Sequence, residues 1–480
     1  MNEKTWRCGS LTYTKPALVM LFFWLLWGDF CYVLTEAVVP SVMPLKFKAL
    51  GASNTLMALV MATIPGALGA VLNPVISFRS DRFRGKWGRR IPFLLFTLPG
   101  LVACLVILAF ADQIGLGLRD LLLTAGGGAI SPNHAILATL GVSLILFTFF
   151  NAFTTSVFWY LLNDVVPEKL LARFLSWFRI ISLGTSSLYN FFVLKHAETH
   201  YAEILIGGAI VYAIGFTLLC LNVKEGEYPP PPENVDHKPG LLSAVKTYAR
   251  ECHVHRLYWY QFLGAFSGSF GTCLGLVGGT GGFMLFYYKS RGLDLAQIGQ
   301  LVAIYNIVVA VLVLGTGWLA DRFHPIRVVA AGVAWNVVVL LAGTVWIFWN
   351  PAPEVAYWGW ATLMLGLAAP NAAMAAMSDP PLLMRVMPRS RFGQFCSANN
   401  LWRTVGGLVG AVAGGGFLDV MKRFVDEEHT YCYIPVWQIV FTVPTVVLFY
   451  KFFKTWKKCG GDTDYEAPLT KADKVAVGGR

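Results

Sequence analysis

The sequence predicts an all-α membrane protein with twelve transmembrane helices in two six-helix bundles related by pseudo-two-fold symmetry. The 480-residue chain is 56% hydrophobic and only 14% charged, whereas soluble domains carry about 25% charged residues. Its apolar residues form successive runs long enough to cross a bilayer, which takes about 20 residues. Motifs from the first half also return six runs later in the second half, which indicates two related bundles.

The expected membrane spans follow from these apolar runs. The first run comes after Lys4, Arg7 and Lys15 and has no small-residue cleavage site behind it, so we interpret it as a spanning helix and not as a removable signal peptide. The twelve expected spans are residues 17–40, 54–78, 91–111, 135–163, 172–194, 202–222, 257–288, 296–320, 327–349, 357–378, 395–418 and 433–453.

The stretch between the sixth and seventh spans differs in composition from the rest. It contains four consecutive prolines at 229–232 and several acidic residues, which is typical of a linker. A polar tail follows the last span. We therefore expect an N-terminal bundle over 1–222, a cytoplasmic central loop over 223–256, a C-terminal bundle over 257–453 and a disordered cytoplasmic tail over 454–480.

The distribution of positive charge predicts the orientation in the membrane. Residues 73–93 read NPVISFRSDRFRGKWGRRIPF, so a strongly basic loop separates the second and third spans. Lys and Arg accumulate in cytoplasmic loops, and here they are more frequent in the loops on the side of the N-terminus. Both termini are therefore expected in the cytoplasm, and the protein in the cell membrane. The net charge of +11 lies at the ends of apolar runs, which favours contact with the lipid bilayer over binding of nucleic acid.

The two halves of the chain repeat the same motifs. The second span ends in SDRFRGKWGRR, and the eighth ends in LADRFHPIR. The fourth span ends at Asp164 and is followed by Arg173, while the tenth ends at Asp379 and is followed by Arg391. A period of six spans is typical of transporters built from two parallel repeats.

The basic loop also carries a family resemblance. Its GKWGRR string after SDR resembles the signature of the major facilitator superfamily. It is more similar still to the glycoside–pentoside–hexuronide:cation symporters and the related sucrose–proton symporters, whose loop reads approximately NPxxGxxSDRxxxxxGRRxPF. The likeness extends over about residues 15–455, although the second half matches only in general outline. The matching residues are Asn73, Pro74, Ser80, Asp81, Arg82, Gly88, Arg89, Arg90, Pro92 and Phe93.

The resemblance implies a function and two site residues. Melibiose-type members of this branch contact sugar through an Asp in a GDF- or KDF-like string, which matches Asp29 in the first span. They also place an Arg in the substrate and coupling region of the fifth span, where this chain has Arg179. Sodium-using relatives carry acidic residues at the positions of Gly69 and Asn73, so the resemblance favours H+ over Na+ as the coupling ion. No cofactor is expected.

Ionisable residues within the spans are the candidates for chemistry. Asp29, Glu36, Arg179 and Arg403 lie inside apolar runs, where each costs at least ~2.5–3.5 kcal/mol unless it has a partner or a water-filled cavity. The two arginines occupy equivalent spans of the two repeats, so we expect both to face a shared central cavity. An Asp beside an Arg stays ionised while paired and takes up a proton when unpaired. The alternatives are buried structural ion pairs or, for Glu36, a position at the outer surface.

Aromatic and amide side chains suit the walls of a sugar site, because rings stack on the apolar sugar face while amides hydrogen-bond its hydroxyls. Of those available, we single out Tyr32, Trp159 and Asn399, with lipid contact or helix packing as the alternative. The seventh span is rich in glycine around GGTGG at 278–282, which predicts a mobile gate or close helix packing. The wall candidates are Tyr32, Asn151, Trp159, Tyr160, Tyr258, Trp259, Gln261, Asn306, Asn399, Asn400 and Trp402.

The charges at the cytoplasmic ends of the spans have a separate interpretation. They could be simple positive-inside anchors. The fixed positions of Asp, Gly and Pro among them favour a charge-paired latch between the bundles, which must break in the inward-open state. We do not expect substrate to touch this latch. Its expected members are Asp81, Arg82, Arg89, Arg90, Asp164, Arg173, Asp321, Arg322, Asp379 and Arg391.

Together these observations predict a secondary active transporter that moves a sugar or glycoside with a proton, as a monomer, by alternating access. No enzyme motif of the GxSxG, HExxH or Walker type occurs in the sequence. Two alternatives remain open at this point. One is a facilitator or efflux carrier of another small metabolite, and the other is a membrane enzyme or receptor with transporter-like topology.

Overall fold

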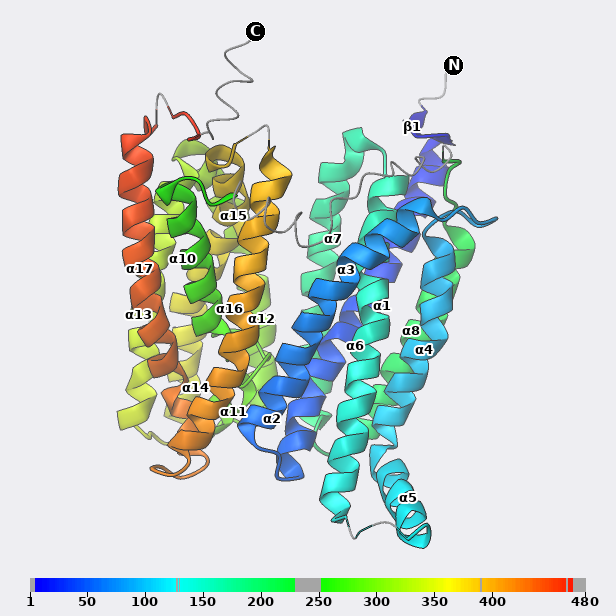
Figure 1. Ribbon diagram of the computed structural model, residues 1–480, viewed down its shortest axis with the longest axis vertical. Coiled ribbons are helices and arrows are strands. Elements are labelled where there is room, and N and C mark those ends of the chain that lie inside the picture. Colours follow the sequence, from blue (N-terminus) through cyan, green and yellow to red (C-terminus); the bar gives the residue numbers. More distant parts are fainter. Residues whose placement is uncertain are drawn as a thin grey trace. The chain divides into compact units, whose positions relative to one another are not determined.

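The computed structural model describes residues 5–126, 128, 130–228, 252–388, 391–462 and 465–468. The chain divides into two compact units (Figure 1). The first holds Met1–Glu233 with Asp294–Ala303, and the second holds Asn234–Leu293 with Ile304–Arg480. Long helices that run side by side make up most of each unit, which confirms the predicted all-α class.

The first unit contains the helices of the first six expected spans. Helix α1 packs on α7 and α8, and α4 packs on α6 and α8, so these four contacts enclose the core of the unit. Among the residues in its core are Leu25, Leu101, Leu161 and Phe216, each at most 1% exposed. The main helices are α1 (Lys15–Ala49), α2 (Asn54–Ala58), α3 (Ile64–Arg82), α4 (Ile91–Ala109), α6 (Pro132–Val165), α7 (Glu168–Leu188) and α8 (Tyr201–Asn222).

The second unit is built in the same manner. Helix α10 packs on α16 and α17, and α13 packs on α15 and α17. Helix α12 has residues in both units, because the division falls after Ala303. The helices are α10 (Arg256–Thr272), α11 (Met284–Lys289), α12 (Leu295–Arg322), α13 (Pro325–Phe348), α14 (Pro353–Ala361), α15 (Ala369–Val386), α16 (Phe392–Met421) and α17 (Ile434–Lys458).

Within the described residues, ten helices are long and apolar enough to cross a membrane. Two of them, Asn54–Arg82 and Pro353–Val386, run through a π-helical turn without interruption. The other two expected spans correspond to α7 and α10. Helix α7 is less apolar because it carries Lys169, Arg173 and Arg179, and α10 ends after only 17 residues.

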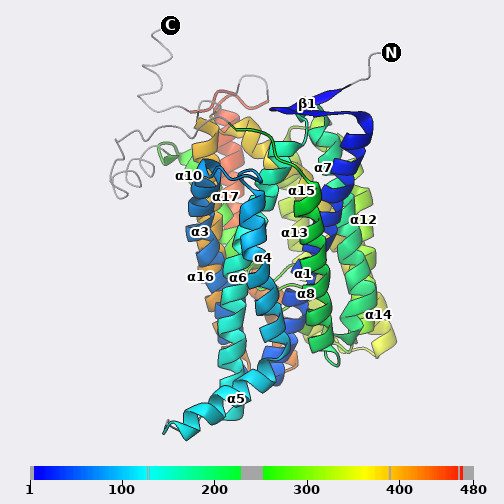
Figure 2. The same cartoon turned by 90° about the vertical axis from the view of Figure 1, so that its right-hand side faces the viewer.

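Three elements were not expected from the sequence. A short antiparallel hairpin, β1 (Trp6–Cys8) with β2 (Leu11–Tyr13), precedes α1. The amphipathic helix α5 (Ala111–Thr124) follows α4 and projects from the end of the unit (Figure 2).

Helix α17 also continues to Lys458, so the expected start of a disordered tail at 454 is wrong. Its aromatic residues, including the fully buried Trp456, keep this last turn packed on the unit.

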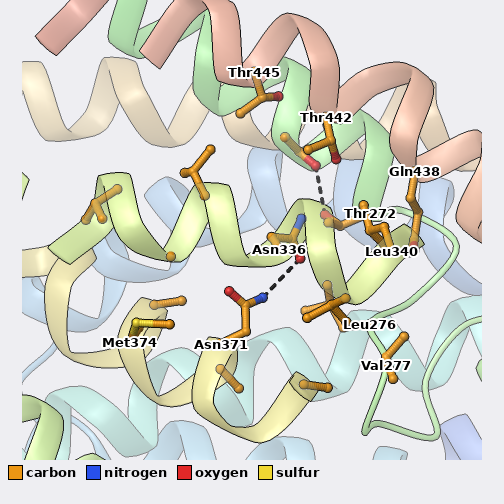
Figure 3. A pocket seen from close by; sticks show the side chains of 18 of the residues that line it. Thr272, Leu276, Val277, Asn336, Leu340, Asn371, Met374, Gln438, Thr442 and Thr445 are labelled. Carbon is orange, nitrogen blue, oxygen red and sulfur yellow. Dashed lines mark hydrogen bonds between the residues drawn. The ribbon is translucent and has the colours of Figure 1, made fainter. Parts of the chain in front are cut away.

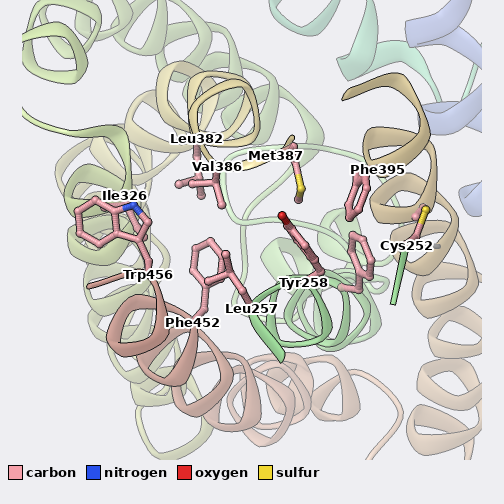
Figure 4. Close-up of a cluster of buried hydrophobic side chains, with 12 residues drawn as sticks. Cys252, Leu257, Tyr258, Ile326, Leu382, Val386, Met387, Phe395, Phe452 and Trp456 are labelled. Carbon is pink, nitrogen blue, oxygen red and sulfur yellow. The ribbon is translucent and has the colours of Figure 1, made fainter. Parts of the chain in front are cut away.

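A cluster of buried hydrophobic side chains closes one end of the second unit (Figure 4). Helices α10, α15, α16 and α17 all contribute to it, and Tyr465 from beyond α17 packs against it. Tyr465 donates a hydrogen bond to the carbonyl of Val386 (2.7 Å), while Asp462 forms an ion pair with Arg327. Part of the C-terminal segment is therefore ordered on the unit, because it buries an aromatic ring.

The glycine-rich seventh span is interrupted in the structure, and the mobile gate expected there stays a prediction. Helix α10 ends at Thr272, and residues 273–283 are not helical. Gly278 has a φ of +99°, and an added Cβ would collide with the ring of Tyr305, so no other residue fits. The hydroxyl of Tyr288 accepts a hydrogen bond from the Gly278 amide (2.9 Å) and donates one to the Gly279 carbonyl (3.2 Å). The break is thus held in place by side chains.

Candidate functional site: a polar face on the first helix and an ion network

The first candidate region is a polar face on α1. Asp29, Tyr32 and Glu36 are three and four residues apart, which places them on one side of the helix. Their described hydrogen-bond partners all come from α6 and α7. We call this set the polar face of α1. Its members are Asp29, Tyr32 and Glu36 of α1, Asn151 and Thr155 of α6, and Ser182 of α7.

Asp29 is the most buried charged group of this face, at 1% exposed. Its Oδ2 accepts a hydrogen bond from the hydroxyl of Ser182 (2.7 Å), and the carboxylate also interacts electrostatically with Arg179. Its other oxygen, Oδ1, is buried and has no hydrogen-bond partner among the described residues. A buried oxygen left in this state is costly, because transfer out of water is not compensated by a hydrogen bond. Within the described residues, the hydrogen-bonding capacity of Oδ1 is therefore unused.

Tyr32 connects the middle of the face to α6. Its hydroxyl lies 2.8 Å from Oγ1 of Thr155, and the Thr155 hydroxyl donates to the carbonyl of Asn151 (2.9 Å). Because the single Thr155 proton is used in that bond, Tyr32 is the donor to Thr155. The ring of Tyr32 also packs at 6.2 Å from that of Phe158.

Glu36 continues the face one turn further along α1. It is half-buried, and its Oε1 accepts a hydrogen bond from the side-chain amide of Asn151 (2.5 Å). By helix geometry it stands ~10 Å along the axis from Asp29. Glu36 therefore belongs to the same polar face as Asp29, a point that the sequence left open.

Arg179 and Trp159 lie at the edge of this region. Arg179 is exposed on α7, and it interacts electrostatically with the carboxylate of Asp29 on the polar face. Trp159 of α6 is 46% exposed, and its ring stands 5.0 Å from that of Phe178, the neighbour of Arg179 in the chain. The first unit therefore gathers Asp29, Arg179, Tyr32 and Trp159 from three helices. Sequence reasoning did not identify Thr155 and Ser182, because isolated hydroxyls in a span also bond to the backbone of their own helix.

The remaining predicted site residues lie in the second unit. Asn399 of α16 is 1% exposed, and its Oδ1 accepts a hydrogen bond from the amide of Gln261 on α10 (3.3 Å). Arg403, one turn further along α16, lines a cavity of about 430 Å³ together with Gln261. The cavity expected to be shared by Arg179 and Arg403 stays a prediction.

The second candidate region is a network of ions at the ends of α3, α4 and α6. Arg89 donates two hydrogen bonds to Asp164, from Nε (2.9 Å) and Nη2 (2.7 Å). Arg90, only 4% exposed, donates to Asp164 from Nε (2.9 Å) and to Asp81 from Nη2. Burial alone lowers the pKa of Arg89, but its hydrogen bonds and charge pairing with Asp164 outweigh this and raise the pKa overall. These four side chains form what we call the ion network.

A carboxylate from beyond α8 completes this network. Glu225 accepts hydrogen bonds from the three backbone amides of Arg89 (2.9 Å), Arg90 (2.8 Å) and Ile91 (2.7 Å), so it caps the N-terminus of α4. A negative charge at this end of a helix is favourable because the free N–H groups and the helix dipole are positive there. Gly88 has a φ of +100°, and an added Cβ would stand 2.6 Å from the Glu225 Cβ, which explains the glycine of the motif.

Neighbouring segments hold Glu225 in position. Tyr228 donates a hydrogen bond to Glu225 (3.0 Å), and its ring lies 4.0 Å from the guanidinium of Arg89. Burial raises the pKa of Tyr228, and the charges of Glu225 and Asp164 raise it further, so the phenol stays protonated. The hydroxyl of Ser10, at the turn of the N-terminal hairpin, accepts a hydrogen bond from the Glu227 amide (2.7 Å).

The other expected latch residues are not members of the ion network as the structure describes it. The described side-chain partners of Asp164 are Arg89, Arg90 and Tyr228, and Arg173 is exposed on α7. Arg82 stacks on Phe78 at 3.9 Å, and Arg322 lies 5.9 Å from the ring of Phe323. The side chains of Asp321 and Asp379 lie outside the described part of the structure, and Arg391 precedes α16 as its N-cap. Within the first unit, the motif therefore fastens α3, α4 and α6 to one another.

Long apolar helices with charged groups buried in their spans define a multi-pass membrane protein of the transporter type. The chain belongs to the major facilitator superfamily, whose family model matches residues 25–411. It is therefore a secondary transporter of this superfamily, and the resemblance seen in the sequence is confirmed at that level. The narrower symporter branch stays a prediction.

Among curated proteins, the chain is similar to solute carrier family 45 member 4. It is 25% identical to the Homo sapiens protein over 251 residues, which make up 49% of this chain and 31% of that protein. It is 24% identical to the Mus musculus protein over 251 residues, or 50% of this chain and 30% of that one. The match thus spans about a third of the length of these relatives.

Several solved structures share the fold. A bacterial homologue of the iron transporter ferroportin in the inward-facing state has a TM-score of 0.64 and 16% identity, covering 91% of this chain and 99% of that one. A bacterial homologue of the human lysosomal transporter Spinster has a TM-score of 0.64 and 14% identity, covering 95% and 100%. The nucleoside transporter NupG has a TM-score of 0.59 and 13% identity, covering 91% and 99%. At these identities the likeness establishes the fold alone.

The cap on α4 leads to a stability prediction. Glu225→Gln replaces a carboxylate that accepts three backbone hydrogen bonds by an amide whose NH₂ group cannot accept any. The variant should lose ~1–3 kcal/mol of stability, the usual cost of leaving buried donors unsatisfied. The measurement is the thermal unfolding of the purified protein in detergent. Glu227→Gln is the matched control, because Glu227 is exposed and contributes only its backbone amide. Equal melting temperatures of the two variants would contradict the proposed cap.

Glu36 and Asn151 allow a second prediction. The described hydrogen-bond partner of Glu36 is a neutral amide, so a neutral Gln can keep the same bond. Glu36→Gln should therefore retain transport within about twofold of wild type, whereas Glu36→Ala should be destabilised by ~1–3 kcal/mol, because the Asn151 amide loses its acceptor. The measurements are solute uptake by each variant in proteoliposomes and the thermal unfolding of each purified variant. Loss of transport in the Gln variant, at normal stability, would show that the charge of Glu36 is needed.

Proposed function

We propose that the protein is a proton-coupled symporter of a sugar or glycoside that works by alternating access. The observation that carries this proposal is Asp29. It is a carboxyl group at 1% exposure in a membrane-spanning helix, with one oxygen bonded to Ser182 and the other without a hydrogen bond to any described residue. A carboxyl group buried in this way is costly unless it is paired or protonated. We therefore expect its hydrogen-bond partner or its protonation state to change during transport.

The chemistry of Asp29 and Arg179 supports coupling between the movement of the proton and that of the sugar. A guanidinium close to a carboxylate favours the ionised form, and loss of that interaction favours protonation. Sugar hydroxyls suit the same groups, because a carboxylate accepts hydrogen bonds and a guanidinium donates them. A solute that competes for Arg179 would therefore change the proton affinity of Asp29. In this way binding of the solute and of the proton become linked.

The region around Asn73 supports a proton over sodium as the coupling ion. Sodium prefers carboxylate and carbonyl oxygens, like other hard cations. Gly69 and Asn73 of α3 supply no carboxylate, and the Asn73 carbonyl accepts a hydrogen bond from Ser156 (3.1 Å). No cofactor is part of this proposal, and the working unit is a monomer.

The ion network fits the role of a conformational latch. Its arginines and carboxylates fasten the ends of three helices outside the spans, where changes of ion pairing are least costly. We place this end of the protein in the cytoplasm on the basis of the positive charge of the loop. The protein would then lie in the cell membrane with both termini inside.

The test is sugar uptake into proteoliposomes with an imposed pH or sodium gradient. A panel of labelled mono- and disaccharides would include glucose, xylose and sucrose. With one proton per sugar, a gradient of one pH unit can drive about tenfold accumulation. Asp29→Asn should abolish accumulation against the gradient, because the amide cannot carry the proton.

The matched control is Asp120→Asn on α5, where the carboxylate is 69% exposed. This variant should behave like the wild type. If no sugar accumulates under either gradient while Asp29→Asn is indistinguishable from wild type, the proposal of proton-coupled sugar symport is wrong.

A further inference from the structure

The break in the seventh span opens a cavity within the second unit. It has a volume of about 270 Å³ and is lined by Thr272 at the end of α10, Leu276 and Val277 of the break, and side chains of α12, α13, α15 and α17. Helix α10 is 17 residues long, which places the break ~25 Å from its start. Transporter sites often lie at such interrupted helices, because unwound backbone there is free to contact a solute.

Amide side chains from three helices line this cavity: Asn336 and Asn371 lie side by side, and Gln438 lies apart from them (Figure 3). Asn371 of α15 donates a hydrogen bond to the side-chain carbonyl of Asn336 on α13 (3.0 Å). That bond leaves the carbonyl of Asn371 and the NH₂ group of Asn336 able to bind a further partner. Each can therefore serve one hydroxyl group, as acceptor or as donor.

Gln438 of α17 supplies the second, independent observation. It is 2% exposed, and its NH₂ group donates to the carbonyl of Gly275 in the break (2.6 Å). Gln438 lines the cavity, and its own carbonyl oxygen, Oε1, is buried and has no hydrogen-bond partner within the described part of the chain. An unpaired buried carbonyl costs about 1–3 kcal/mol. A hydroxyl group bound in the cavity would recover this cost.

The chemistry of the walls selects an uncharged solute. None of the described residues that line this cavity is charged, and apolar side chains such as Leu340 and Met374 complete its walls. A charged solute would lose its hydration there without gaining a counter-ion. A hydroxylated ring has apolar faces for these walls and hydroxyl groups for the amides.

The cavity is not isolated from the residues predicted from the sequence. It shares Gly268, Thr272 and Leu276 with the cavity of about 430 Å³ that reaches Gln261 and Arg403. Ligand pockets usually measure about 300–1,000 Å³. One ring would therefore fill the smaller cavity, and a second ring would extend toward Arg403.

We infer that the cavity at the helix break is a binding site for an uncharged, hydroxylated ring, and that Gln438, Asn336 and Asn371 hydrogen-bond its hydroxyls. The inference rests on the proposed sugar transport and adds a subsite in the second unit. It predicts that loss of these amides weakens sugar binding, while the proton chemistry of Asp29 in the first unit is untouched.

The experiment is equilibrium dialysis of the purified full-length protein against labelled glucose, xylose and sucrose. Asn371→Leu and Gln438→Met should each raise the Kd of the bound sugar by about tenfold, the equivalent of one lost hydrogen bond of ~1.4 kcal/mol. Leu341→Met is the matched control, because Leu341 is exposed on α13 and is not among the described residues that line the cavity; its Kd should stay within about twofold. Glucosamine, a charged analogue, should bind more weakly than glucose.

The outcomes separate this inference from the proposed function. If the wild type binds a sugar and both amide variants bind it equally well, the subsite is wrong and sugar symport stands. If glucosamine binds as tightly as glucose, the selection for an uncharged ring is wrong. If the wild type binds none of the three sugars, both proposals fail. Gln438→Met removes a bond to the break, so thermal unfolding is measured alongside; if that variant is unstable, Asn371→Leu decides, because its bond goes to Asn336.

Discussion

A polar group in the hydrocarbon region of a bilayer must find its hydrogen-bond partners inside the protein, and this constraint determines where the polar side chains of the chain lie. It explains why the polar residues of α1 share one face and why their partners come from α6 and α7. The same constraint makes exceptions informative. Oδ1 of Asp29 and Oε1 of Gln438 are buried without hydrogen-bond partners among the described residues, and the proposals for the proton and for the solute start from these two atoms.

The two units satisfy the constraint with different chemistry. The polar face of the first unit contains two carboxyl groups and lies beside Arg179, and one of them, Asp29, is the proposed carrier of the proton. The helix-break cavity of the second unit is lined by neutral amides and hydroxyls, so it suits hydrogen bonding to an uncharged solute. The charges that hold helices together lie instead at helix ends. There Glu225 accepts hydrogen bonds from free backbone amides, and the arginines of the ion network pair with its carboxylates. Among the described residues, these structural ion pairs are thus separate from the polar face of α1 and from the helix-break cavity.

The fold was predictable from the sequence because bilayer thickness dictates the length of an apolar run and positive charge marks its ends. Asp29 and Arg179 could be singled out since charges in spans are rare. The roles of Ser182 and Glu225 could not be. Ser182 is an ordinary hydroxyl in a helix, and Glu225 lies 135 residues along the chain from Arg90, whose backbone amide is one of the three that it caps. The hairpin, α5 and the amide cavity likewise depend on tertiary contacts that no local pattern encodes.

The central claim is that one proton moves with each sugar and that Asp29 carries it. The most direct measurement uses a pH-sensitive dye trapped in proteoliposomes, with equal pH on both sides and unlabelled sugar added outside. Symport predicts that the lumen becomes acidic as sugar enters, and that Asp29→Asn removes this signal. If labelled sugar equilibrates across the same membranes while the internal pH stays constant in the wild type, the protein is a facilitator and the account of Asp29 is wrong.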